Sequence, residues 1–73
     1  MDANILKGKW KQLVGDMKRR WADLTDDDWT HIDGDKDRFI GKIQERYGYA
    51  KDRAGAEIDE FLDKWDTRGR RVS

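Results

Sequence analysis

Six basic residues, spaced at intervals of four and seven, are the side chains best suited to bind a ligand. They form two basic stripes, the first of Lys7, Lys11 and Lys18 and the second of Arg38, Lys42 and Arg46. At these intervals the members of a stripe share one face of an α-helix, so their charges would lie together. Such a face can bind the phosphates of nucleic acid. Acidic residues elsewhere supply as much negative charge, which favours solvated, partly paired faces instead.

Trp29 stands among acids in a short predicted helix, whereas the other three tryptophans fall at the apolar positions of longer helices. Large aromatic side chains fill cores, but an exposed one can anchor a partner protein. Two interpretations of Trp29 are therefore open: membership of the core, which we favour, and an exposed partner anchor.

The residues needed for catalysis or metal binding do not come together in this sequence. His31 is the only histidine, cysteine is absent, and Ser73 is the only serine, so no Ser–His or Cys–His arrangement is expected. The acidic run 33–37 resembles the start of a calcium loop. However, the positions that need a turn glycine and a bidentate glutamate hold Arg38 and Gln44. We therefore expect no enzyme, no bound metal and no cofactor.

The elements that position these residues come from a unit that recurs after 26 residues. Its two copies share six identities and four apolar or aromatic exchanges over 26 aligned positions. The identical pairs are Gly8/Gly34, Gly15/Gly41, Arg20/Arg46, Asp26/Asp52, Ile32/Ile58 and Asp33/Asp59. A recurring unit of this size indicates repeated supersecondary structure. We expect each copy to be a helical hairpin, and two hairpins to form one small domain.

Apolar residues recur every three or four positions and proline is absent, which predicts helices throughout. The first helix would cover about residues 4–21. A second, short helix would begin after Thr25, whose side chain can cap it, with Asp28 as the partner in a capping box. Gly34 offers a left-handed conformation that would end this helix.

A third helix would be capped by Asp35 and ended by Gly48, and a fourth would cover about residues 50–66. The remaining residues carry several arginines but no apolar periodicity. We therefore divide the chain into one helical domain, residues 1–66, and a flexible basic tail, residues 67–73.

Gly15 and Gly41 occupy equivalent positions inside the first and third helices, where glycine costs about 1 kcal/mol relative to alanine. A cost that recurs at equivalent positions predicts the close approach of another helix. Replacing Gly41 with leucine would then lower the melting temperature. The alternative is that helical glycine is simply tolerated at both positions.

Composition places the chain among small folded domains. Of its 73 residues 44% are charged, but 16 basic and 16 acidic residues leave no net charge at pH 7. Self-repulsion is therefore weak, and four tryptophans are more than a disordered segment usually carries, so we favour a folded domain over a disordered one. No apolar run approaches the ~20 residues that span a bilayer, and no secretory signal opens the sequence. We expect a cytoplasmic protein that does not bind membranes.

Three segments resemble the CsbD family of small bacterial stress-response proteins. They are Gly8–Gly15, Trp21–Asp28 (Trp-Ala-Asp-Leu-Thr-Asp-Asp-Asp) and Gly34–Tyr49, which ends in Gly41–Tyr49 (Gly-Lys-Ile-Gln-Glu-Arg-Tyr-Gly-Tyr). The resemblance covers about residues 4–55 and weakens after Ala56. It implies an all-α domain of four or so helices, with two hairpins packed crosswise as in SAM-like folds, in the bacterial cytoplasm. It implies no biochemical activity and no site residues.

These observations predict a non-enzymatic stress-response protein that acts as an interaction module or as a soluble protectant. Its expected partner is another protein of unknown identity, and we expect a monomer or a weak dimer. The less favoured alternative is a nucleic-acid-binding domain that uses the two basic stripes. SAM-like folds serve in both kinds of recognition, so the fold alone does not choose between them.

Overall fold

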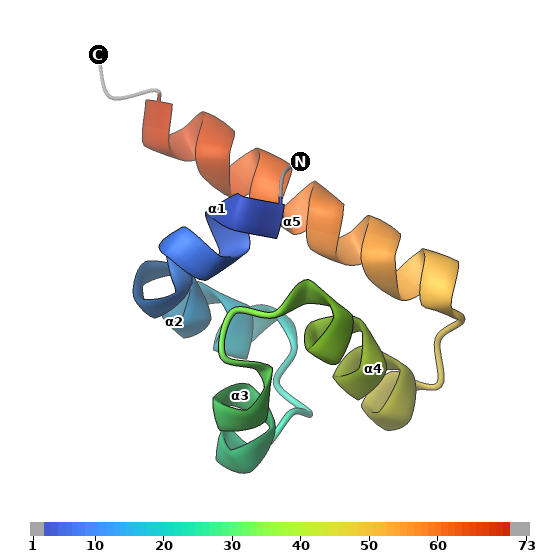
Figure 1. The fold of residues 1–73 in the computed structure, drawn as a ribbon. Helices are drawn as coiled ribbons and strands as arrows, with labels where there is room; N and C mark the ends of the chain where they lie inside the picture. The colour runs from blue at the N-terminus through green and yellow to red at the C-terminus, as the bar shows by residue number, and fades with distance from the viewer. Residues whose placement is uncertain (1–2, 71–73) are drawn as a thin grey trace.

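The computed structural model describes the backbone of residues 3–70 and the side chains of residues 5–65. Within this range it contains five helices and no strand, which confirms the all-α prediction (Figure 1). The helices are α1 (Ala3–Gly8), α2 (Trp10–Arg20), α3 (Asp26–Ile32), α4 (Lys36–Tyr47) and α5 (Lys51–Arg70). None of the helices in the described range is long and apolar enough to cross a membrane.

The predicted first helix is divided into α1 and α2 by a bend at Lys9, whose φ and ψ are −110° and 17°. Hydrogen bonds continue across the bend, because the Lys9 amide donates to the Ile5 carbonyl at 2.9 Å and the Leu13 amide to the Lys9 carbonyl at 2.9 Å. Gly8 precedes the bend and is a poor helix former. The chain therefore changes direction here without a loop.

The predicted N-terminal caps of α3 and α4 are confirmed, whereas α3 ends at Asp33, already left-handed with a φ of 42°, one residue before the predicted end at Gly34. The Thr25 hydroxyl accepts from the Asp28 amide at 3.1 Å, and the Asp28 carboxylate accepts from the Thr25 amide at 3.0 Å, which completes a capping box. Asp35 caps α4 by accepting from the Arg38 amide at 3.0 Å. Gly48 ends α4 with a φ of 71°, a left-handed conformation that suits glycine.

The core is organised around Phe39 of α4, which is fully buried. Its ring centroid lies 5.0 Å from that of Trp21, 5.4 Å from Trp29 and 6.5 Å from Trp10, each pair meeting edge to face. The other buried apolar residues are Leu6, Leu13, Met17, Leu24, Ile32, Ile40, Ile43, Ala54, Ile58 and Leu62. One aromatic residue of α4 thus joins α2 and α3.

The prediction of close helix approach at Gly15 and Gly41 is wrong. Both glycines are exposed, and a Cβ built on either would meet no neighbouring atom of the described structure within 4 Å. The apolar stripes of α2 and α4 face the core, so these glycines lie on the outer faces. The close approach is instead at buried Gly34, where a Cβ would lie 3.1 Å from the Lys7 Cα.

The repeated unit is visible in the helix boundaries, because α2 and α4 begin 26 residues apart. Helix α4 packs against both α3 and α5, while the crosswise packing of two hairpins stays a prediction. Helix α5 continues to Arg70, beyond the predicted end near residue 66. Residues 71–73 of the predicted basic tail lie outside the described residues, so the division into domain and tail also stays a prediction.

Candidate interaction surface

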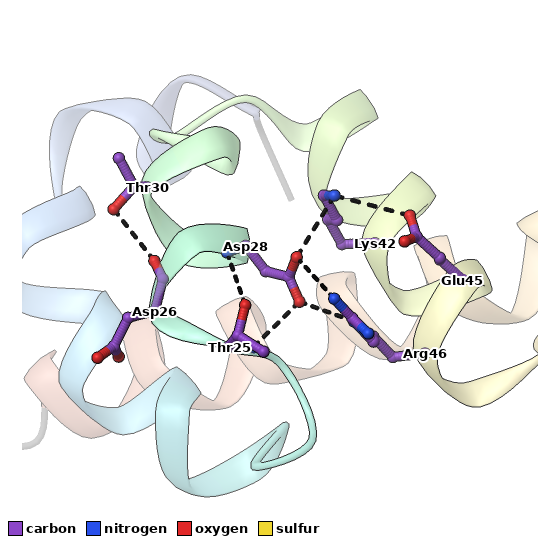
Figure 2. Close-up of polar contacts among 7 residues, drawn as sticks. All are labelled: Thr25, Asp26, Asp28, Thr30, Lys42, Glu45 and Arg46. Atoms are coloured by element: carbon purple, nitrogen blue, oxygen red, sulfur yellow. Dashed lines mark hydrogen bonds and ion pairs between the residues drawn. The ribbon is translucent and has the colours of Figure 1, made fainter.

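Two residues of the second basic stripe, Lys42 and Arg46, converge on Asp28 of α3 (Figure 2). The Arg46 Nε donates to Asp28 Oδ2 at 2.8 Å and Nη2 donates to Oδ1 at 3.3 Å. The Lys42 Nζ lies 3.4 Å from Oδ1. The Asp28 side chain is only 5% exposed, whereas Arg46 is 38% and Lys42 22% exposed. We call these three residues the Asp28 clasp.

The Asp28 clasp keeps its carboxylate ionised. The hydrogen bond from Arg46 holds the pKa of Asp28 well below its usual value, and the Thr25 amide and Lys42 act in the same direction. Burial opposes this effect but is the smaller influence. In return, Asp28 raises the pKa of Arg46. With both its oxygens engaged, Asp28 is poorly suited to donate a proton or to bind a metal, and it links α3 to α4.

Two further residues of the predicted stripes also contact groups within the fold. Lys18 lies 3.7 Å from Asp26 across the α2–α3 connection, and both side chains are solvent-exposed. The Arg38 Nη1 donates to the backbone carbonyl of His31 at 3.2 Å. Lys18 and Arg38 thus contact other segments of the chain, whereas Lys42 also pairs with Glu45 at helical spacing, at 3.6 Å, as the interpretation of partly paired faces predicted.

Lys7 and Lys11 are exposed, and no acid among the described side chains forms an ion pair with either. Both line an open groove of about 390 Å³ at the α1–α2 bend. We call it the Trp10 groove, and its lining residues are Lys7, Gly8, Lys9, Trp10, Lys11, Gln12 and Asp33. The structure thus places two predicted residues beside a third lysine and an aromatic ring.

Lys9 and Trp10 belong to this groove but were not predicted as members of a site. In a continuous helix, residue 9 would point about 200° away from residues 7 and 11, so it was not part of the stripe. The bend at Lys9 removes that regular geometry and brings all three lysines to one groove. The available signal was the local Lys-Gly-Lys-Trp-Lys sequence, in which lysines surround a tryptophan.

Trp29 belongs to the core, as the favoured interpretation predicted, and the alternative of an exposed partner anchor is wrong. Its residue exposure is 4%, and its ring centroid lies 6.1 Å from Trp10 and 5.4 Å from Phe39. Helix α3 is short and packs against α4. Trp29, like its neighbour Asp28, is buried in this helix pair. Trp10, which is only partly buried, is the tryptophan that reaches the Trp10 groove.

A second aromatic group joins α4 to α5. Tyr47 and Tyr49 stack with ring centroids 5.5 Å apart, and the Arg53 guanidinium carbon lies 3.8 Å from the Tyr49 centroid. The Tyr47 hydroxyl accepts from the Asp23 amide at 3.2 Å. These contacts hold together the segments around the α4–α5 connection.

Comparison with known proteins gives a consistent result. A model of the CsbD-like family matches residues 4–55. The chain is 52% identical over 64 residues to UPF0337 protein PA4738 of Pseudomonas aeruginosa, covering 88% of this chain and 98% of that protein. It is 52% identical over 68 residues to UPF0337 protein YjbJ of Escherichia coli K12, covering 93% of each. It is 54% identical to UPF0337 protein YjbJ of Salmonella typhimurium, covering 93% of this chain and 91% of that protein.

Proposed function

This chain belongs to the CsbD-like family, as the sequence resemblance predicted, and we propose that it is a non-enzymatic stress-response protein that acts by binding a partner. The observation that carries the proposal is the Trp10 groove. It presents three lysines and an aromatic ring to solvent, whereas Lys42 and Arg46 are held in the Asp28 clasp. Charged groups that a fold does not use internally are available for recognition.

The ionisable groups support binding over catalysis. Catalytic acids and bases have pKa values shifted towards neutrality and face a cleft. The acid with a strongly shifted pKa in the described structure is Asp28, and its pKa moves away from neutrality. Its oxygens accept from the Thr25 amide and from Arg46, so the shift is explained by helix capping and helix pairing.

Site-specific cross-linking in stressed bacteria tests this proposal. A photo-activated amino acid would replace Gln12, which lines the Trp10 groove, and in a control strain it would replace exposed Ala50. Ala50 belongs to the connection between α4 and α5, and Figure 1 shows this connection on the opposite side from α1 and α2. We expect discrete adducts from position 12 that disappear when Lys7 and Lys11 are both replaced by glutamine. The same adducts from both positions, or adducts indifferent to the lysine substitutions, would contradict the proposal.

A soluble protectant is the second form that this function can take. It is supported by a surface in which 16 basic and 16 acidic residues balance, because such surfaces remain hydrated without strong self-repulsion. Light scattering from a heat-labile enzyme would be followed with this protein and with an inert protein of equal size. If the Lys7→Gln/Lys11→Gln variant still reduces aggregation of the enzyme, the protection comes from the overall surface composition and not from the Trp10 groove. Protection no better than that of the inert protein would reject this form.

A further inference from the structure

We propose that the partner of the Trp10 groove is single-stranded nucleic acid, with a base against Trp10 and neighbouring phosphates on Lys7, Lys9 and Lys11. This inference rests on the proposed function, since it names the partner of the same groove. It narrows the predicted nucleic-acid contact from six residues on two stripes to one groove on α1 and α2.

The charges of the Trp10 groove favour a polyanion. Its lining residues include three lysines within five positions and a single acid, Asp33. No ion pair within the described side chains joins Asp33 to any of these lysines, so their charges remain directed at solvent. Lysines in a row bind successive phosphates and release counterions from the nucleic acid when they do so.

Trp10 offers an aromatic surface to a base, a contact that a ligand made only of phosphates could not form. Its ring is partly buried and is backed by Trp29 and Phe39, at 6.1 and 6.5 Å between centroids. This backing restricts the ring, and Trp10, which is only partly buried, is one of the residues that line the groove. A base packed against an exposed aromatic ring contributes about 1–3 kcal/mol in single-strand complexes. Proteins that bind single-stranded nucleic acid usually combine aromatic side chains, on which bases stack, with basic side chains that contact the phosphates.

The dimensions of the Trp10 groove favour a single strand over a duplex. A volume of about 390 Å³ falls at the lower end of the range for small-ligand sites, about 300–1,000 Å³, so it suits one nucleoside and not a helix. In a duplex the bases are stacked and paired, and Trp10 would have no base to contact. An acidic peptide would satisfy the lysines but would leave the aromatic ring without a specific partner.

Fluorescence anisotropy with a labelled 12-residue oligothymidylate tests the inference. Three phosphate contacts predict a slope of about −2 for log K against log salt, which is a loss of about 20-fold between 50 and 200 mM salt. The Lys7→Gln/Lys11→Gln variant should bind about 25-fold more weakly at 0.1 M salt, with a slope near −0.7. Arg19→Gln/Lys51→Gln is the matched control, because it removes the same charge from exposed residues outside the groove.

Two further measurements separate base contact from phosphate contact. Trp10→Phe retains an aromatic ring in the core, whereas Trp10→Leu removes it, so the leucine variant should bind more weakly at equal salt slope. Both variants must first show a cooperative melt, and the lysine variants carry the test if the leucine variant does not fold. A duplex and an inorganic polyphosphate of matched charge should bind more weakly than the oligothymidylate.

Several outcomes would overturn the inference. The first is an affinity for the oligothymidylate that does not change with salt. The second is an equal loss of affinity in Lys7→Gln/Lys11→Gln and in Arg19→Gln/Lys51→Gln. The third is an affinity for polyphosphate as high as that for the oligothymidylate. If the oligonucleotide fails to bind but position 12 forms lysine-dependent adducts with a protein, the proposed function stands and this inference fails. If neither is seen, both fail.

Discussion

Replacing Asp28 with alanine should be among the most damaging single changes on the polar side of α3. Asp28 has two tasks: its carboxylate caps the first turn of α3 through the Thr25 amide, and it receives the Arg46 guanidinium and the Lys42 ammonium (Figure 2). Alanine ends both. It also leaves Arg46 without the carboxylate that links α4 to α3.

The expected loss of stability follows from these two tasks. An N-terminal cap contributes about 1 kcal/mol, and hydrogen bonds to a charged group contribute about 1.5–3 kcal/mol. Solvent screens the second contribution, because the Arg46 side chain is 38% exposed and the Lys42 side chain 22%. Alanine also avoids the cost of burying a carboxylate. The net loss should be about 2 kcal/mol, which for a chain of this size lowers the melting temperature by about 8–16 °C.

Thermal melts followed by circular dichroism at neutral pH measure this loss. Asp27→Ala is the matched control, because Asp27 occupies the same helical turn and is exposed. It removes the same favourable charge from the start of α3, so it should cost less than about 1 kcal/mol. Asp28→Asn keeps a cap acceptor and should fall between the two. If Asp28→Ala and Asp27→Ala melt at the same temperature, the Asp28 clasp does not stabilise the fold.

Four other predictions follow from the contacts of the described residues. Since the pKa of Asp28 is lower in the folded than in the unfolded chain, its contribution is complete at neutral pH and is lost as the pH falls below about 4. Urea melts at pH 7 and 2.5 should therefore show a larger loss for the native chain than for Asp28→Asn, and equal losses would refute this. Gly34→Ala should destabilise by about 1–2 kcal/mol, because its φ is 80° and a Cβ would meet the α1 backbone. Gly41→Ala should stabilise by up to about 1 kcal/mol in the same thermal melts, and a destabilised variant would restore the idea of close helix approach. Arg46→Gln should lower the melting temperature more than Arg20→Gln, because Arg46 serves a buried carboxylate; the reverse order would contradict this.

The parts of the fold that could be predicted from the sequence depend on neighbours along the chain. The Thr25–Asp28 capping box and the Asp35 cap involve residues three positions apart, so residue type and spacing determine them. The apolar period that predicts helices also agrees with the inward face of α4, since Phe39 and Ile43 follow it and are buried. Local chemistry and helical periodicity are sufficient for such features.

The parts that were missed depend on contacts between distant segments. Nothing in the local sequence shows that Arg46 reaches a carboxylate 18 residues earlier, because that pairing exists only once α4 packs on α3. The glycines were misread for the same reason. Gly15 and Gly41 looked special because they recur inside helices, but the tight approach to another helix is at Gly34, where a Cβ would lie 3.1 Å from the Lys7 Cα. The candidate site required the bend at Lys9, which helical periodicity does not predict.

The repeated arginines show how the two units are joined. Arg20 and Arg46 are equivalent in the 26-residue repeat, and each pairs with an acid of the other unit. Arg46 of the second unit binds Asp28 of the first, whereas Arg20 of the first binds Glu57 of the second at 2.8 Å. In the repeat, Glu57 corresponds to position 31, one helical turn after Asp28 and so on the same face. Reciprocal pairing of this kind links each unit to the other. The lysines of the Trp10 groove take no part in it, which leaves that end of the first unit available to a partner.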